Sequence, residues 1–165
     1  MVSRRKGPLR AWRIGDGRHP VFDGKGARDR GGRWNSPGRE AIYAAATYAG
    51  AMLEQLSYAG IGFLPKGQVW IEIQIPAIPI EVVESGDVPG WELEDKIASQ
   101  EYGDKWLDEN RTAVLLVPSV VSSGIEKNVV INPAHKDFPR ITHSAPRKME
   151  WHERFLVPPP AGRKK

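Results

Sequence analysis

The sequence predicts a single α+β domain built from short, mainly antiparallel strands and a few helices. Its 165 residues suffice for one domain with a real hydrophobic core and are too few for two. Apolar residues recur at helical spacing over residues 45–59. Shorter segments at 68–75 and 113–117 show the alternating and the continuous apolar patterns of half-buried and fully buried strands.

The segments before the predicted helix are expected to be, in chain order, a strand, a glycine- and arginine-rich loop, a strand-like stretch (GRWN) that ends in a Ser-Pro-Gly turn, and a second strand. They cover residues 9–14, 15–32, 32–38 and 41–44. On the first strand, Leu9, Ala11 and Arg13 share one face because side chains alternate along a strand.

The predicted helix carries six apolar residues at helical spacing: Ala45, Tyr48, Ala49, Met52, Leu53 and Leu56. Gly60 is a natural stop for it. In the strand at 68–75, four apolar residues point inward: Val69, Ile71, Ile73 and Ile75. The rest of the chain is expected to contain an acidic helix, two buried strands, and then strand and loop, at residues 97–109, 113–117, 128–131 and 139–157.

Positive charge is concentrated at the two ends and in one internal segment. Six Arg and Lys residues lie in segments 1–8 and 157–165, which we expect to be basic tails, so residues 9–156 carry a net charge of −2 although the whole chain carries +4. Residues 10–39 hold eight Arg or Lys against three Asp, whereas residues 81–109 hold ten acids against two Lys. This separation favours a local anion site over a nucleic-acid-binding face, so direct nucleic-acid binding is not expected.

The sequence lacks the features of several classes of site. It has no cysteine, which excludes disulfides and thiol chemistry, and its four histidines show no metal-ligand spacing, so we expect no metal. It contains no Walker loop, no dinucleotide fingerprint and no serine-nucleophile elbow. No apolar run could span a bilayer and the start does not resemble a signal peptide, so we expect a cytoplasmic protein without a membrane partner.

Glu54 is the only charged residue between Ala41 and Pro65. On a helical wheel it lies opposite the Met52/Leu53/Leu56 stripe. Its neighbours on that side are mostly small: Thr47, Gly50, Ala51 and Tyr58. This pattern suggests that something approaches this face of the helix closely. Glu54 is therefore either a single solvated glutamate or a functional carboxylate in a cleft near a basic segment.

Arg13 and Arg33 flank the glycine-rich loop and are candidate anion-binding residues. Guanidinium groups bind phosphate oxygens in bidentate fashion, and glycines let backbone N–H groups approach the same anion. Surface ion pairs are the alternative for each arginine. Tyr43 is either a core residue or a stacking platform, and Ser119, at the end of a buried strand, is either a turn residue or part of a cleft.

The segment FDGKGARDRGGRWNSPGREAIYAAATYAGAMLEQL, residues 22–56, resembles the signature of the RES domain, which is named for its arginine, glutamate and serine. Further similarity lies in LLVPSVV, NVVINPAH and VWIEIQIP, and it spans roughly residues 9–156. The resemblance implies an ADP-ribosyltransferase-like fold and the toxin of a bacterial toxin–antitoxin pair, with a cognate Xre-type antitoxin as partner.

The same resemblance implies a glycosyltransferase that needs no metal and takes NAD as its substrate. Members of the family split the nicotinamide–ribose bond and pass ADP-ribose to a protein, to phosphate or to water. Glu54, Arg33 and Tyr43 would form the catalytic set, with Glu54 as the catalytic carboxylate and Tyr43 packed on the nicotinamide end. The residues that the resemblance places around NAD are Arg13, Arg33, Tyr43, Ser119 and Asn128.

Two other functions are compatible with parts of the sequence. A metal-independent nucleotide hydrolase could use the same basic loop, but it would release phosphate and leave the nicotinamide bond intact. A non-enzymatic, basic-tailed module that associates with nucleic acid would explain the charged ends. The negative charge of residues 9–156 and the absence of an RNP-like aromatic motif both argue against such a module.

Overall fold

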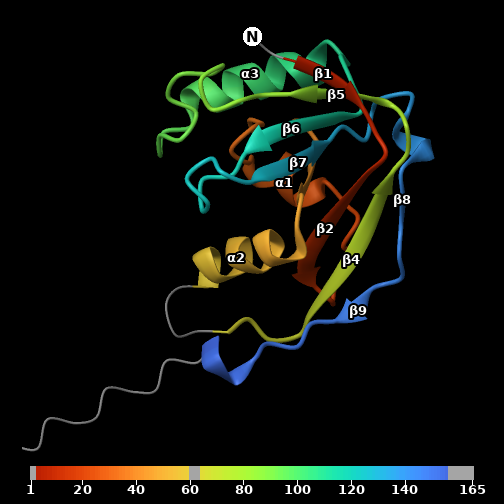
Figure 1. Ribbon diagram of the computed structural model, residues 1–165, viewed down its shortest axis with the longest axis vertical. Coiled ribbons are helices and arrows are strands. Elements are labelled where there is room, and N and C mark those ends of the chain that lie inside the picture. The colour runs from red at the N-terminus through yellow and green to blue at the C-terminus, as the bar shows by residue number, and fades with distance from the viewer. Residues whose placement is uncertain (1–2, 60–63, 156–165) are drawn as a thin grey trace, which may run out of the picture.

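The computed structural model describes residues 3–59 and 64–155, which form a curved sheet with two long helices on one face (Figure 1). The strands are β1 Ser3–Lys6, β2 Leu9–Asp16, β3 Ile42–Ala45, β4 Gln68–Ile75, β5 Pro79–Val82, β6 Val114–Pro118, β7 Lys127–Ile131, β8 Thr142–His143 and β9 Arg147–Lys148. The α-helices are α1 Lys25–Arg30, α2 Tyr48–Ala59 and α3 Ile97–Asp108, and two 3-10 turns cover Phe138–Arg140 and Glu153–Phe155.

The sheet order is β1-β5-β6-β7-β3-β2-β4-β8, with β9 pairing with β4 as well. Every pair of strands is antiparallel except β5 and β6. The structure thus confirms the predicted α+β class with mainly antiparallel strands. Among the described residues, no helix has the length and apolar character needed to cross a membrane.

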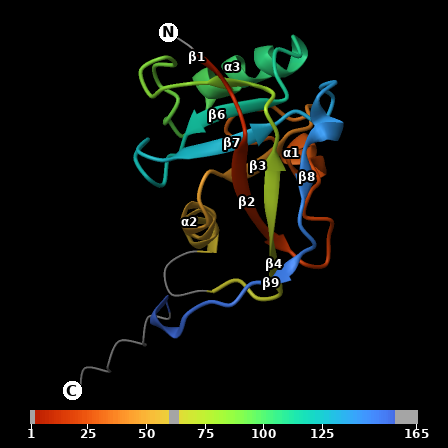
Figure 2. The same ribbon diagram turned by 45° about the vertical axis from the view of Figure 1, so that its right-hand side comes forward.

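The sheet nearly divides between β2 and β3. These two strands pair at a single position, Trp12 with Ala45, whereas β2 pairs with β4 along its whole length. Figures 1 and 2 show β2 and β4 running across the direction of β6 and β7. The sheet therefore bends sharply at this junction into two halves.

Each face of the sheet has its own apolar packing. One face holds the largest core cluster, which includes Ala11, Ile42, Ile71 and Val129. On the other face, α3 packs over β5, β6 and β7 around Trp106, and α2 packs over β2 and β3. Residues of β6 and β7 that point to this second face therefore lie on the same side of the sheet as both long helices.

Several predicted elements are confirmed with small shifts. The alternating segment at 68–75 is β4 with the same bounds, and the strand at 41–44 is β3, one residue later. The predicted helix at 45–59 begins only at Tyr48, because Thr47 caps it: the Thr47 hydroxyl accepts a hydrogen bond from the Gly50 N–H at 2.9 Å. Its expected stop, Gly60, lies outside the described residues.

Other expectations are wrong in detail. Residues 32–35 do not form a strand but a tight turn closed by a bridge between Gly32 and Asn35, and the loop at 15–32 contains α1. The segment expected as an N-terminal basic tail contributes β1, an edge strand whose four residues are all exposed and which pairs with β5. The segment SRRK has no alternation of apolar and polar residues, because all four residues are exposed, so its sequence does not indicate a strand. The C-terminal segment 157–165 lies outside the described residues.

Candidate active site

Glu54 lies where α2 approaches the ends of β6 and β7. Its Oε1 accepts hydrogen bonds from the Ser119 hydroxyl at 3.0 Å and from the Asn128 side-chain amide at 2.6 Å. Ser119 directly follows β6 and is buried, and Asn128 lies in β7, paired with Val117. Three residues singled out from the sequence, each from a different part of the chain, are thus brought together around one carboxylate.

The small residues beside Glu54 allow this close approach, as the sequence pattern predicts. The Thr47 hydroxyl donates to Glu126 Oε2 at 2.9 Å, which ties the first turn of α2 to the β6–β7 loop. A Cβ atom at Gly50 would lie 2.8 Å from the same carboxylate oxygen. Glycine at position 50 therefore lets the loop reach the helix.

The face of α2 that packs on the sheet differs from the expected Met52/Leu53/Leu56 stripe. Ala51 is the buried residue of α2 and packs with Ile14, while Leu53 is 44 % exposed. The Gln55 amide reinforces this orientation by donating to the Ile14 carbonyl. The helix is rotated relative to the prediction because its tight contact with the sheet uses alanine rather than leucine.

Arg33 lies on the loop between α1 and β3 and reaches across to the loop before α3. Its Nη1 donates to the carbonyls of Trp91 at 2.9 Å and Leu93 at 2.8 Å. The described residues provide no hydrogen-bond partner for its Nε and Nη2. The guanidinium is thus held from one side, while its remaining donors stay available to an anion.

The charges of both Glu54 and Arg33 affect the pKa of Tyr58. Tyr58 lies one helical turn after Glu54 and is 83 % exposed as a residue. The protein around its hydroxyl raises the pKa of Tyr58, the Glu54 carboxylate raises it further, and the Arg33 guanidinium opposes the rise. The Glu54 and Arg33 charges therefore act in opposite directions on the pKa of the Tyr58 phenol.

The GGRWN turn places the half-buried Arg33 directly before two buried residues. Gly31 has a φ of 74°, a conformation that favours glycine. A Cβ at Gly32 would lie 2.6 Å from the Tyr43 hydroxyl oxygen, so only glycine fits there. Trp34 and Asn35, which follow Arg33, are both buried.

Tyr43 supports this turn with its hydroxyl group. The hydroxyl accepts a hydrogen bond from the Trp34 N–H at 2.9 Å and donates to Asn35 Oδ1 at 2.7 Å. Burial is the main reason why the pKa of Tyr43 is raised well above its ordinary value. The hydroxyl thus supports the turn, while the partly buried side chain packs against the cluster around Trp106.

Arg13 does not join the Glu54 site. Side chains alternate along β2, and Arg13 shares the face of Ala11, which belongs to the core cluster on the side of the sheet away from α2. Its guanidinium donates to the carbonyls of Tyr43 at 2.6 Å and Asp23 at 3.2 Å. Arg13 therefore fills the junction where β2 and β3 separate, and it braces the strand that carries Tyr43.

Asn35 escaped the sequence analysis although it organises the turn. It is fully buried, and its amide donates to the carbonyls of Ala27, Ser36 and Arg39. An asparagine between tryptophan and serine in a turn-rich segment carries no sequence signal for burial. Only its place within the GRWN motif could have singled it out.

The arrangement combines one anion-binding group with one carboxylate, without a cluster of metal ligands. Among the described residues, no group of three or more His, Cys, Asp or Glu side chains is placed to hold a metal ion. Arg33 can bind a phosphate, and Glu54 can stabilise positive charge that develops beside it. This combination suits a phosphorylated substrate whose reaction passes through a cation.

Comparison with known proteins identifies a family. A family model described as "RES domain" matches residues 10–152. The "Prs ADP-ribosylating toxin" of Sphingobium sp. (strain YBL2) is 38% identical over 154 residues, which cover 88% of this chain and 95% of that protein. A "Toxin Res" of Yersinia enterocolitica is 34% identical over 120 residues, with 72% of this chain and 78% of that protein covered.

A solved structure shares the fold. The chain matches the crystal structure of the M. tuberculosis MbcT–MbcA toxin–antitoxin complex with a TM-score of 0.74 and 17% identity. The match covers 88% of this chain and 86% of the matched chain.

Proposed function

Because the chain belongs to the RES domain family, we propose that it is the toxin of a toxin–antitoxin pair and that it consumes NAD at the Glu54 site. The observation that carries this proposal is the Glu54 carboxylate, which the Ser119 hydroxyl and the Asn128 amide, two neutral donors, hold by one oxygen. The toxin names of the relatives support the same conclusion.

The proposed reaction breaks the bond between nicotinamide and ribose C1′. The bonding electron pair goes to the nicotinamide nitrogen, which is already cationic, so no general acid has to protonate the leaving group. Positive charge develops on the ribose, and Glu54 stabilises it electrostatically. The acceptor's lone pair then forms the new bond to C1′, and the acceptor loses its proton.

Arg33 is proposed to hold the pyrophosphate during this step. Its Nη1 is fixed by the Trp91 and Leu93 carbonyls, so the remaining donors are oriented before NAD binds. Such preorganisation keeps the reacting ribose beside the carboxylate. Tyr43 contributes by supporting the turn that carries Arg33, and Ser119 and Asn128 contribute by orienting Glu54. Arg13 is not part of this set.

We propose a protein as the acceptor of ADP-ribose. The relative from Sphingobium is named for ADP-ribosylation of Prs, and this chain covers 95% of that protein at 38% identity. The site is also accessible, since Tyr58 beside Glu54 is 83 % exposed. A protein surface could therefore approach the ribose directly, and a protein of the Prs kind is the first target to test.

An antitoxin partner of the Xre type completes the proposal. The matched M. tuberculosis structure is by its title a toxin–antitoxin complex. Large apolar side chains are exposed on the segments around the site: Leu53, Tyr58, Leu93, Ile97 and Ile125. Exposed apolar residues grouped in this way mark an interaction surface. We place toxin and partner in the cytoplasm, where NAD is available.

The function is tested by incubating the purified chain with NAD, with and without phosphate and a Prs-type protein, and following the products by mass spectrometry. Release of nicotinamide with ADP-ribose attached to the protein is the expected result. Attachment of ADP-ribose to phosphate, or release of free ADP-ribose, would show that the acceptor is phosphate or water instead of a protein. The proposed cleavage of the nicotinamide–ribose bond would still stand. Nicotinamide at the level of the enzyme-free control in every arm would refute the function, and phosphate release from nucleotides would favour a hydrolase.

A further inference from the structure

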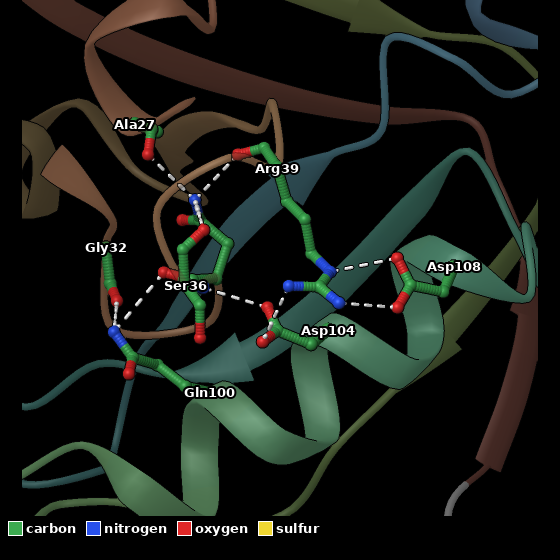
Figure 3. A network of polar contacts seen from close by, with 8 residues as sticks. Ala27, Gly32, Ser36, Arg39, Gln100, Asp104 and Asp108 are labelled. Carbon is green, nitrogen blue, oxygen red and sulfur yellow. Dashed lines mark hydrogen bonds and ion pairs between the residues drawn. The ribbon is translucent and has the colours of Figure 1, made fainter. Parts of the chain in front are cut away.

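Helix α3 contacts the Gly32–Ser36 turn, which carries Arg33, through a network of polar side chains (Figure 3). We propose that Gln100 and Asp104 of α3 are positioning residues, which hold the Gly32–Ser36 turn so that Arg33 meets the substrate in one orientation. The proposal rests on the function proposed above and extends it to a helix that contributes no residue to the Glu54 site.

Gln100 binds the turn at its two ends. Its side-chain amide donates to the Gly32 carbonyl at 2.9 Å and to the Asn35 carbonyl at 3.3 Å. These two carbonyls flank Arg33 and Trp34, and the Asn35 carbonyl also accepts the Gly32 N–H that closes the turn. One amide group thus fixes both sides of the segment that projects Arg33.

Asp104 holds the same turn one helical turn further along α3. Its Oδ1 accepts the Ser36 N–H at 2.8 Å, and its Oδ2 lies 3.3 Å from Arg39 Nη1. Arg39 also bonds Asp108 through Nε and Nη2, at 2.9 and 2.8 Å. Helix α3 therefore holds the chain on both sides of residues 37–38, at Ser36 and at Arg39 (Figure 3).

The backbone of α3 approaches the turn so closely that no side chain fits between them. A Cβ atom at Gly103 would lie 1.8 Å from the Trp34 carbonyl oxygen. Trp34 itself is 2 % exposed and packs with Trp106 of the same helix. Two contacts therefore orient Arg33. The next residue, Trp34, is buried against α3, and the Arg33 guanidinium donates to the Trp91 and Leu93 carbonyls.

The test uses a double-mutant cycle between α3 and Arg33, measured as NAD turnover. Gln100→Met keeps the length of the side chain but removes the donor, and Asp104→Ala removes the acceptor. We expect each to lower kcat/KM for NAD by about 10- to 100-fold, the usual loss for a small misplacement of a substrate-binding group. In an Arg33→Ala background the same changes should have almost no further effect, because they act through Arg33.

Two further variants and one exchange measurement separate positioning from simple destabilisation. Asp104→Asn keeps an oxygen for the Ser36 N–H and should recover most of the activity that Asp104→Ala loses. Lys105→Met, on the exposed side of α3 with only a distant ion pair to Glu109, should match the parent. Amide hydrogen exchange at Ser36 should accelerate in Asp104→Ala at a temperature where the variant is folded.

The outcomes distinguish this proposal from the proposed function. If the parent releases nicotinamide but the losses from Gln100→Met and Arg33→Ala multiply independently, the positioning role is overturned and the function stands. Parent-like kcat/KM in both α3 variants would overturn it as well. If the parent itself leaves NAD intact, the proposed function fails and the catalytic role of α3 fails with it.

Discussion

Glu54 uses one carboxylate oxygen for the protein and leaves the other to a ligand. Oε1 accepts both hydrogen bonds, from Ser119 and Asn128, and the described residues give Oε2 no partner. Two neutral donors orient a carboxylate without cancelling its charge. A negative charge fixed in this way can act on a cation that exists only during the reaction.

Tyr43→Phe tests whether the Tyr43 hydroxyl has a supporting rather than a chemical role. Removing it leaves the buried Trp34 N–H and Asn35 Oδ1 without their partner. We expect the free energy of unfolding to fall by about 1–3 kcal/mol. Thermal unfolding of variant and parent measures this. An unchanged stability combined with lost NAD turnover would instead assign the hydroxyl to the reaction.

At the scale of elements, periodic segments were predictable and contact-dependent ones were not. The alternation of β4 follows from burial of one face, so its bounds could be read from the sequence. In contrast, β1 consists of SRRK, and it is a strand because β5 offers a free edge. The GRWN turn reads as a strand, yet the φ of Gly31 and the Tyr43 hydroxyl close it into a turn.

The residues of the candidate site also divide into those that a local sequence signal could identify and those whose place depends on contacts between distant segments. Glu54 and Ser119 could be identified because a charge on an otherwise uncharged helix and a polar residue at a strand end are local signals, whereas Asn128 followed from the family resemblance alone. The three residues lie together. The place of Arg13 could not be predicted, because it depends on the gap between β2 and β3, which only the three-dimensional pairing reveals. Side chains of α3 give no local signal at all, since their effect is on a turn about 65 residues away.

Gly103→Ala tests how tightly α3 packs on the Arg33 turn. Alanine is normally the better helix residue by about 1 kcal/mol. Here the new methyl group would meet a backbone carbonyl that cannot rotate away, so we expect a net loss of stability of about 1–3 kcal/mol. Gly86→Ala is the matched control, because a Cβ there meets no atom within 4 Å. Equal unfolding midpoints for the two variants would contradict the packing.

At the scale of the whole molecule, the two long helices α2 and α3 lie on one face of the sheet (Figure 2), and Glu54 is carried by the first of them. The large exposed apolar side chains lie on these helices, on the loop before α3 and on the β6–β7 loop, except for Phe155. The proposed catalytic groups and the proposed interaction surface therefore share one side. A partner bound there would cover the site.

A partner that covers this side should neutralise the protein in cells. Expression of the chain alone should stop growth, and co-expression with the proposed Xre-type antitoxin should restore it. Ile125→Asp, which places a charge on a side chain that is 87 % exposed, should weaken rescue while leaving NAD turnover of the purified chain intact. Normal growth with abundant folded toxin and no partner would count against this account.

The most direct test of the central claim is nicotinamide release by Glu54→Gln beside the parent. Glutamine keeps the size and an oxygen for Ser119 and Asn128 but removes the charge, so the rate should fall by about 100- to 1,000-fold, or roughly 3–4 kcal/mol in activation free energy. NAD binding and the unfolding midpoint should change little, and Glu101→Gln, the same substitution at an exposed position of α3, should match the parent. Parent-like release of nicotinamide by folded Glu54→Gln would contradict the account.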